Sequence, residues 1–354
     1  MSPDGALGRA AFGGLTLLGK KGRTLKKLSQ HVQYLIATNG TLLGLILLII
    51  MFSVANENFF SWQNAKNIGQ AISELGVVSI PLALLVISGA VDLSIGSIAS
   101  LSGIVAATVM VETDSTVLGV TAGLGVGAVA GAINGYLVSY VNLNSIVVTL
   151  GALSIWGGMA LYITGGQTVA GLPESFTELA NIEIFGVSIE ILVLAAAVLY
   201  GVVLLSKLPY GRRLYAVGGN QRAAFLMGIP VQRVRFLMFV QVGLAAALVG
   251  LMLASKLAAA TPITGQGLEI NALTVVLLGG VAFTGGMGRI AGVAAGLFFV
   301  GVLRNGLVVT DTSQFLQQVF VGAILIAAVA LDDKIRQFVQ QRANLRTSLD
   351  QPAE

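Results

Sequence analysis

Long runs of apolar residues follow one another along most of the chain, separated by short polar stretches. A helix of about eighteen or more apolar residues can cross the ~30 Å hydrocarbon core of a bilayer. The pattern therefore predicts an all-α, polytopic membrane protein with about ten transmembrane helices. Their expected ranges, with ends placed to within about three residues, are 36–55, 71–91, 94–111, 116–139, 146–164, 188–206, 234–255, 270–284, 288–308 and 314–331.

Glycine and proline mark irregular places within these segments. The eighth segment is short and contains Gly279-Gly280, so we expect it to be broken or re-entrant, and Pro81 predicts a kink or a break in the second. Glycines recur at every fourth residue in two segments: Gly119, Gly123, Gly127, Gly131 and Gly135 in the fourth, and Gly288, Gly292 and Gly296 in the ninth. Small residues at this spacing let backbones approach closely, and we favour packing within the bundle over a subunit interface.

Lysine and arginine gather in the polar stretches on one side of this arrangement. Of the twenty in the chain, six lie in residues 1–40, six in 207–235 and four in the tail from Asp332, and Arg289 follows the eighth segment. With ten spans and a cytoplasmic N-terminus, all of these lie in the cytoplasm, where membrane proteins collect such residues. Only Lys66, Lys256 and the membrane-embedded Arg304 fall elsewhere. We therefore predict that both termini are cytoplasmic, with a basic N-terminal segment (1–35), a transmembrane domain (36–331) containing a cytoplasmic loop (207–235), and a cytoplasmic tail (332–354).

The composition is that of a chain lying mostly in lipid. Apolar residues make up 55% of the 354 positions, charged residues 10%, and the mean hydropathy is +0.88. A soluble domain carries about 25% charged residues, so this chain cannot cover itself with a water-exposed surface. It has no cysteine and one histidine, His31, which excludes disulfides, thiolate chemistry and a Cys- or His-based metal site. Because no histidine is available to activate a serine, we expect no catalytic residues.

Two glycine-containing stretches imitate nucleotide-binding motifs. Residues 14–21 read GLTLLGKK, but Lys21 stands where the phosphate-binding loop needs Ser or Thr for magnesium, and no strand precedes it. Residues 286–291 read GMGRIA and lie in a turn between two membrane segments. We expect no cofactor on this chain, so ATP, if it drives the protein, must bind to another polypeptide. The net charge of +4 reflects topology and does not indicate a nucleic-acid partner.

One carboxylate, Asp92, stands in an almost uncharged region, within the stretch SGAVDLSIGS of residues 88–97. The predicted topology places it at the cytoplasmic end of the second segment, just before the third. With Ser94 beside it, Asp92 is expected to cap the third helix by accepting hydrogen bonds from its free N–H groups, at the positive end of the helix dipole. The functional alternative is an intramembrane acid that relays protons or contacts a ligand.

The same stretch resembles the GIDLSVGS motif of the permease subunits of bacterial ABC monosaccharide importers, of the ribose, xylose and arabinose type. The resemblance continues, in the family's order, through stretches that together cover most of residues 45–335. They are YAVGGN (215–220), GI (228–229), GQGLEINA (265–272), LGG (278–280) and GGMGRIAG (285–292). Met287 departs from the Lys or Val that is common at its position, and the basic N-terminal forty residues are longer than usual.

This resemblance implies a multi-pass permease of the bacterial inner membrane, in contact with membrane lipids, that forms a homodimer or a heterodimer with a second permease. It implies a cytoplasmic ABC ATPase, which binds ATP and magnesium, and an extracytoplasmic solute-binding protein that delivers a monosaccharide or related polyol. Its structural motif residues here are Asp92, Ser94, Gly96, Gly279, Gly280 and Gly286. Two rivals stay open: a permease for another solute, such as a furanone signal or a branched-chain amino acid, and an ion-coupled secondary transporter with Asp92 or Glu74 as its ion-binding carboxylate.

The loop 207–235 contains a predicted short helix. Asn220 is a good N-cap, residues 221–227 can form two turns, Gly228 suits the left-handed position that ends a helix, and Pro230 prevents continuation. Because so short a helix is unstable alone in water, something must hold it, and the resemblance names the ATPase. The expected ATPase-coupling residues are Asn220, Gln221, Arg222, Ala223, Phe225, Leu226, Met227 and Gly228. The alternative is a basic amphipathic loop resting on anionic headgroups.

Polar residues inside the apolar segments are candidates for the substrate path, because a sugar needs hydroxyl and amide partners. These candidates are Ser79, Ser88, Asn134, Thr149, Gln241, Asn271 and Thr274. In lipid the same groups also form interhelical hydrogen bonds, and for any one of them we favour that interpretation. The resemblance implies that the binding protein selects the sugar, so the permease sequence does not name it.

Overall fold

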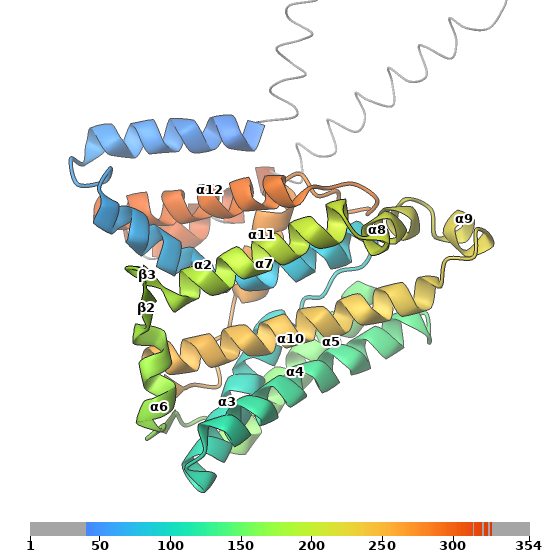
Figure 1. Ribbon diagram of the computed structural model, residues 1–354, viewed down its shortest axis with the longest axis horizontal. Coiled ribbons are helices and arrows are strands. Elements are labelled where there is room, and N and C mark those ends of the chain that lie inside the picture. Colours follow the sequence, from blue (N-terminus) through green and yellow to red (C-terminus); the bar gives the residue numbers. More distant parts are fainter. Residues whose placement is uncertain (1–39, 314, 321, 325, 328–354) are drawn as a thin grey trace, which may run out of the picture.

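The computed structural model describes residues 40–313, 315–320, 322–324 and 326–327, and helices make up nearly all of its regular structure (Figure 1). The helices are Gly40–Ala55, α2 (Trp62–Ile87), α3 (Ile95–Thr113), α4 (Thr116–Ser139), α5 (Ser145–Thr164), α6 (Glu174–Thr177), the 3₁₀ helix η1 (Glu178–Asn181), α7 (Ile189–Ser206), α8 (Pro209–Gly219), α9 (Gln221–Leu226), α10 (Val231–Leu257), α11 (Leu268–Leu278), α12 (Ile290–Val309) and Phe315–Ile324. The predicted segments 1–35 and 332–354 lie outside the described residues.

A helix stands at each of the predicted apolar segments, as far as the described residues reach. Among those residues, seven helices are long and apolar enough to cross a membrane: α2, α3, α4, α5, α7, α10 and α12. The other three, Gly40–Ala55, α11 and Phe315–Ile324, are shorter. The chain is thus a multi-pass helical membrane protein, and the count of ten spans stays a prediction.

The structure confirms the predicted break in the eighth segment and shows no break at Pro81. The eighth segment is broken, as expected, because α11 ends after 11 residues at Gly279 and Gly280 follows with a φ of 75°. A break at Pro81 is wrong, because α2 continues through it. A proline is tolerated inside a membrane helix when neighbouring helices pack around it, and every residue of α2 from Ile72 to Ile87 is buried.

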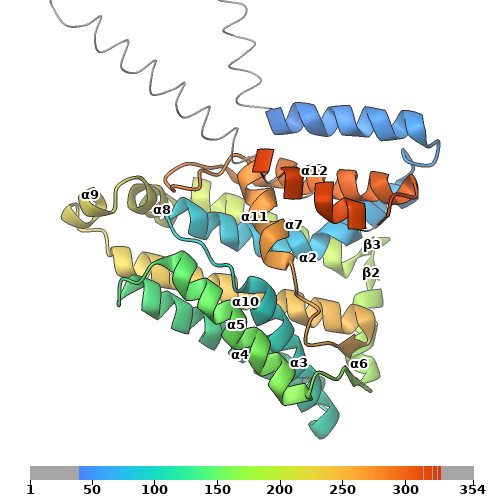
Figure 2. The ribbon, with the colours of Figure 1, turned by 180° about the vertical axis from the view of Figure 1, so that it is seen from behind.

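The helices form two layers that meet along α2 and α10 (Figures 1 and 2). One layer contains Gly40–Ala55, α2, α7, α11 and α12, and the other contains α3, α4, α5 and α10. α2 is central, because it packs against α7, α11 and α12 in its own layer and against α10 in the other. A helix that is apolar on all sides is stable only in such a surrounded position.

Glycines let the helices of one layer lie directly against one another. A Cβ added at Gly127 of α4 would lie 2.4 Å from the carbonyl oxygen of Gly243 on α10, and one at Gly123 would lie 2.9 Å from the carbonyl oxygen of Ser102 on α3. The glycine repeat of the fourth segment therefore packs within the bundle, which confirms the interpretation from sequence.

Two of the motif glycines serve the same purpose around α11. A Cβ at Gly96 in the first turn of α3 would lie 2.3 Å from the carbonyl oxygen of Gly265, just before α11. A Cβ at Gly279 would lie 2.6 Å from the Cα of Val293 on α12. The short α11 is thus held closely at both of its ends.

Short elements lie at the two ends of the bundle. At the end on the left of Figure 1, β2 (Glu183–Ile184) and β3 (Val187–Ser188) form an antiparallel hairpin near α6. β1 (Val169–Ala170) pairs antiparallel with β4 (Ala259–Ala260), with Val169 opposite Ala260. The end on the right carries α8 and α9. The sequence does not predict these strands, because two residues are too few to show a period.

Candidate functional site at the α8–α9 end of the bundle

Three glycine-rich stretches that are far apart in the sequence meet where α2 ends. The N–H of Gly286 donates a hydrogen bond to the carbonyl oxygen of Ile87 at 2.8 Å. A Cβ at Gly218 would lie 1.8 Å from that same oxygen, and one at Gly285, whose φ is 86°, would lie 2.8 Å from the Cα of Gly89. Only glycine permits backbones to approach this closely. We call this contact between Ile87, Gly89, Gly218, Gly285 and Gly286 the glycine junction.

Two tyrosines attach α8 to the elements around the glycine junction. The hydroxyl of Tyr215 donates to the carbonyl oxygen of Gly288 at 2.7 Å, and that of Tyr210 donates to the carbonyl oxygen of Val234 in α10 at 3.0 Å. Burial raises the pKa of Tyr210 to about 12, so its hydroxyl keeps its proton and remains a donor at neutral pH. α8 is therefore tied both to α10 and to the turn between α11 and α12.

α9 begins and ends as the sequence predicts. The side-chain oxygen of Asn220 accepts a hydrogen bond from the N–H of Ala223 at 2.9 Å, and Gly228 follows the helix with a φ of 78°. Three consecutive apolar side chains at its end are largely exposed, namely Phe225 (69%), Leu226 (77%) and Met227 (82%). Contiguous exposed apolar surface of this kind marks a site of interaction with a protein or a membrane.

α8, the other helix of this loop, was not predicted from the sequence. Its buried residues, Gly211, Leu214 and Val217, recur at every third position, and Pro209 is its first residue. Proline at the first helical position and this spacing of buried residues are the signals that predict such a helix.

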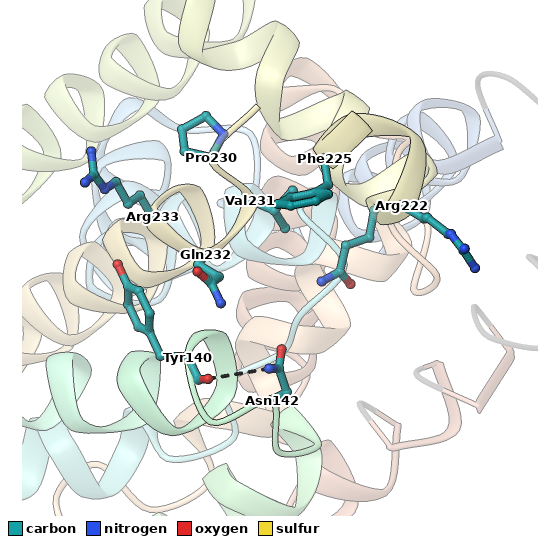
Figure 3. Close-up of a pocket in the computed structure, with 9 residues that line it drawn as sticks. Tyr140, Asn142, Arg222, Phe225, Pro230, Val231, Gln232 and Arg233 are labelled. Carbon is teal, nitrogen blue, oxygen red and sulfur yellow. Dashed lines mark hydrogen bonds between the residues drawn. The ribbon is translucent and has the colours of Figure 1, made fainter. Parts of the chain in front are cut away.

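A pocket of about 710 Å³ opens beside α9 (Figure 3). It is lined by Tyr140 and Asn142 from the turn between α4 and α5, by Gln221, Arg222 and Phe225 from α9, and by Pro230–Arg233 from the start of α10. In Figure 3, Arg222 and Arg233 lie on opposite sides of the pocket. Two parts of the chain that are about eighty residues apart in sequence therefore line the same pocket.

This end of the molecule is basic. Residues 136–145 and 207–235 contain no Asp or Glu. Arg222 and Arg233 are exposed and take part in none of the ion pairs formed by the described residues. Arg235 is partly buried, and its Nε donates to the carbonyl oxygen of Ser88 at 3.2 Å, where a cation is favourable at a helix C-terminus. The surface around the pocket is therefore complementary to a negatively charged partner.

The expectation that Asp92 caps α3 is wrong. α3 begins at Ile95 with Ser94 as its N-cap, so Asp92 precedes the cap and bonds to the cap residue itself. The Asp92 Oδ1 accepts from the N–H and from the hydroxyl of Ser94, at 2.8 Å and 2.6 Å. Asn134 of α4 donates to Ser94 Oγ at 2.8 Å and to Asp92 Oδ2 at 3.4 Å. The side chain of Asp therefore forms a local turn, as it often does in competition with helix structure, and ties that turn to α4.

All seven candidate path residues form side-chain hydrogen bonds within the bundle, although Oδ1 of Asn134 has no partner among the described residues. Four are fully buried and donate their hydroxyls to carbonyl oxygens of their own helices: Ser79, Ser88, Thr149 and Thr274. The other three bond to neighbouring elements, with Asn134 in the Asp92 cluster, Gln241 accepting from the hydroxyl of Tyr200 on α7, and Asn271 accepting from Arg304 on α12 at 2.6 Å. None of the seven lines the pocket beside α9. The structure does not bring them together into one polar site.

Glu74 also differs from a free ion-binding carboxylate. Lys256, near the end of α10, pairs with Glu74 of α2 at 2.8 Å and with Glu190 of α7 at 3.4 Å. Both carboxylates are buried. The lysine therefore compensates their charge and joins three helices at the end opposite α9, which argues against Glu74 as the ion site of a secondary transporter.

A multi-pass helical bundle with a basic pocket and exposed apolar side chains on a short helix at one end is compatible with the membrane subunit of a transport system. The comparison with known families agrees, because residues 64–329 match the family described as branched-chain amino acid transport system / permease component. The chain belongs to this permease family.

Individual relatives are similar to this protein over most of its length. The ribose import permease protein RbsC of Bacillus subtilis (strain 168) is 34% identical over 303 residues, which cover 83% of this chain and 92% of the relative. The L-arabinose transport system permease protein AraH of Escherichia coli (strain K12) is 36% identical over 83% of this chain and 89% of its own length. The D-allose transport system permease protein AlsC of the same strain is 32% identical over 83% and 90%. These matches confirm the resemblance to the ribose and arabinose permeases, and no solved structure matches significantly.

Proposed function

We propose that this chain is the permease subunit of an ATP-driven importer that carries a monosaccharide across a bacterial inner membrane. The observation that carries the proposal is the likeness, over 83% of the chain, to permeases named for ribose, arabinose and allose. The basic α8–α9 end and the helical membrane bundle support it, because an importer subunit needs a membrane path and a place where a motor subunit binds.

The α8–α9 end faces the cytoplasm, both termini lie on that side, and ten helices cross the membrane. The asymmetric placement of lysine and arginine supports this topology. A cytoplasmic ABC ATPase binds ATP and magnesium and performs the hydrolysis, so this chain is not itself an enzyme. A solute-binding protein delivers the sugar at the opposite end. The permease pairs with a second copy or with a second permease, in contact with membrane lipids.

α9 couples the ATPase to the bundle. Its exposed end, Phe225 to Met227, docks into the ATPase, while residues 220–223 and Gly228 set the start and end of the helix. The contacts of α8 support a route for the motion, because α8 directly precedes α9 in the same loop and touches α2 and the α11–α12 turn at the glycine junction. A shift of α9 then moves the ends of several membrane helices together.

Co-purification and reconstitution test this function. The tagged chain should bring down an ATPase, and uptake into vesicles should need ATP, the binding protein and one sugar of a panel that includes ribose, arabinose and allose. Phe225→Asp combined with Leu226→Asp should detach the ATPase and abolish uptake, since burying each such side chain contributes roughly 1.5–3 kcal/mol. The yield of folded permease should hardly change, because both side chains are exposed.

Phe185→Asp is the matched control, because Phe185 is also an exposed phenylalanine but lies at the tip of the hairpin at the opposite end. It should leave ATPase binding unchanged. Arg222→Ala should have little effect if Arg222 faces headgroups, and should clearly weaken ATPase binding if it pairs with a carboxylate of the ATPase. Uptake that survives the double Asp change with no ATPase bound would leave the importer without support.

A branched-chain amino acid is the second candidate substrate, because the matching family is described by that transport system. Adding leucine, isoleucine and valine to the panel separates the two. Stimulation of ATP hydrolysis by an amino acid, with no response to any sugar, would replace the monosaccharide.

A further inference from the structure

We infer that the turn between α4 and α5, residues 140–144, is a second contact for the ATPase. The pocket beside α9 then holds an acidic segment of that subunit between two separate parts of the permease. The inference rests on the proposed function, since it names what the pocket receives, and it goes beyond the docking of α9 alone.

The α4–α5 turn has a fixed shape on its side of the pocket. The Tyr140 ring stacks on Tyr136 with centroids 5.7 Å apart, and meets Phe236 of α10 edge-on at 5.8 Å. Asn142 has a φ of 63°, and Asn144 accepts from the N–H of Ile146 at 2.9 Å and so begins α5. A turn held at both ends is preorganised, so a partner that docks on it loses little conformational freedom.

The turn also carries exposed apolar side chains, and one of them, Tyr140, lines the pocket. Val141 and Leu143 are 47% and 48% exposed. Phe225 lines the pocket from the other side and is more exposed still. Apolar side chains on both sides of a concave site are what an inserted protein segment would bury.

The charge of the residues that line the pocket indicates which kind of protein segment it binds. Of the two parts of the chain that line the pocket, residues 221–233 contribute two arginines, and neither part contributes a carboxylate. Neither Arg222 nor Arg233 belongs to an ion pair of the described residues. Each guanidinium has five N–H donors, which match carboxylates in pairs. The occupant should therefore carry acidic side chains toward the two arginines and apolar ones between them. A bilayer surface is flat and fits a concave pocket less well than a protruding protein segment does.

Photo-cross-linking in the assembled complex tests the second contact. The photoreactive residue p-benzoylphenylalanine replaces Tyr140, where it is a conservative aromatic, and in separate variants Leu143, Phe225 and Tyr162. Tyr162 is exposed near the other end of α5 and is the matched control. Illumination of membranes that contain the permease with its co-purifying ATPase should give a permease–ATPase adduct from positions 140, 143 and 225, and none from 162.

An adduct from position 225 without any from 140 or 143 would overturn the second contact and leave the proposed function intact. Adducts of 140 and 143 with phosphatidylglycerol only, in vesicles that contain this lipid and the ATPase, would also overturn it in favour of a headgroup site. An unmodified permease that binds no ATPase would instead remove the proposed function itself.

Charge reversal gives an independent measure. Arg233→Glu should lower the ATPase recovered per permease by about tenfold or more, since breaking a close interfacial charge pair has at least that effect, whereas Arg233→Lys should keep most of it. Recovery equal to that of the unmodified chain in Arg233→Glu would contradict the acidic occupant.

Discussion

Asp92 brings a carboxylate into a fully buried position, and all of its described hydrogen-bond partners are neutral. Ser94 supplies two of the bonds and Asn134 the third. A buried donor that loses its acceptor costs about 1–3 kcal/mol. The side chain therefore acts as an acceptor that holds the turn before α3, and shape and acceptor capacity should matter more than charge.

This role predicts different outcomes for two substitutions at one position. Asp92→Asn keeps an oxygen for the N–H of Ser94, so most transport should remain. Asp92→Leu leaves the N–H and the hydroxyl of Ser94 without their acceptor and removes one of the two bonds of Asn134. It should lower stability by roughly 1–3 kcal/mol, seen as a lower melting temperature and folded yield in detergent. Complete loss of transport in Asp92→Asn at normal expression would instead indicate that the charge itself is used, as in an ion-coupled transporter.

At the scale of elements, α8 is the link between the exposed α9 and the membrane helices. It contacts α2 by backbone packing at Gly218 and the α11–α12 turn through Tyr215. Contacts between backbones cannot adjust as flexible side chains can, so a change in the position of α8 is passed on and not absorbed.

Two adjacent glycines in the last turn of α8 provide a test. Gly218→Ala would place a Cβ 1.8 Å from the carbonyl oxygen of Ile87, whereas Gly219 has no atom within 4 Å of its added Cβ. Gly218→Ala should therefore reduce stability by about 1–3 kcal/mol or more and lower uptake, while Gly219→Ala should change neither. The readouts are thermal unfolding of the purified chain and uptake per folded permease. Equal behaviour of the two variants would refute the glycine junction.

At the scale of the whole molecule, the two ends have opposite character. Among the described residues, the loop 207–235 and the α4–α5 turn contain no carboxylate, and the exposed arginines of that loop form no ion pair, whereas at the hairpin end Lys66 pairs with Glu183, and Lys256 pairs with two buried glutamates. Free positive charge on one side only is what membrane insertion uses to set orientation.

The orientation can be measured with single cysteines, because the chain has none of its own. Phe185→Cys and Met227→Cys place one thiol at each end, both at exposed positions. A membrane-impermeant maleimide should label the cysteine at 185 in intact spheroplasts and the one at 227 only after the membrane is opened. The reverse order would invert the topology and place α9 outside the cell.

Much of the fold could be predicted from the sequence, because membrane helices are local objects. Apolar runs of sufficient length located α3, α4, α5, α7, α10 and α12 within a few residues, and capping residues located α9. The summed placement of lysines and arginines predicts orientation without any knowledge of packing. These features depend on hydropathy, segment length and charge, and all three can be calculated directly from the sequence.

The rest depended on contacts between distant parts of the chain. That Gly89, Gly218 and Gly285 stand within one junction, that Asn134 reaches Asp92, and that Tyr140 faces α9 across a pocket cannot be deduced from spacing along one helix. The same glycines are compatible with lipid-facing or inward positions until the neighbouring helix is known. Backbone approach in lipid is set by which surfaces pack best, and that is a property of the assembled bundle.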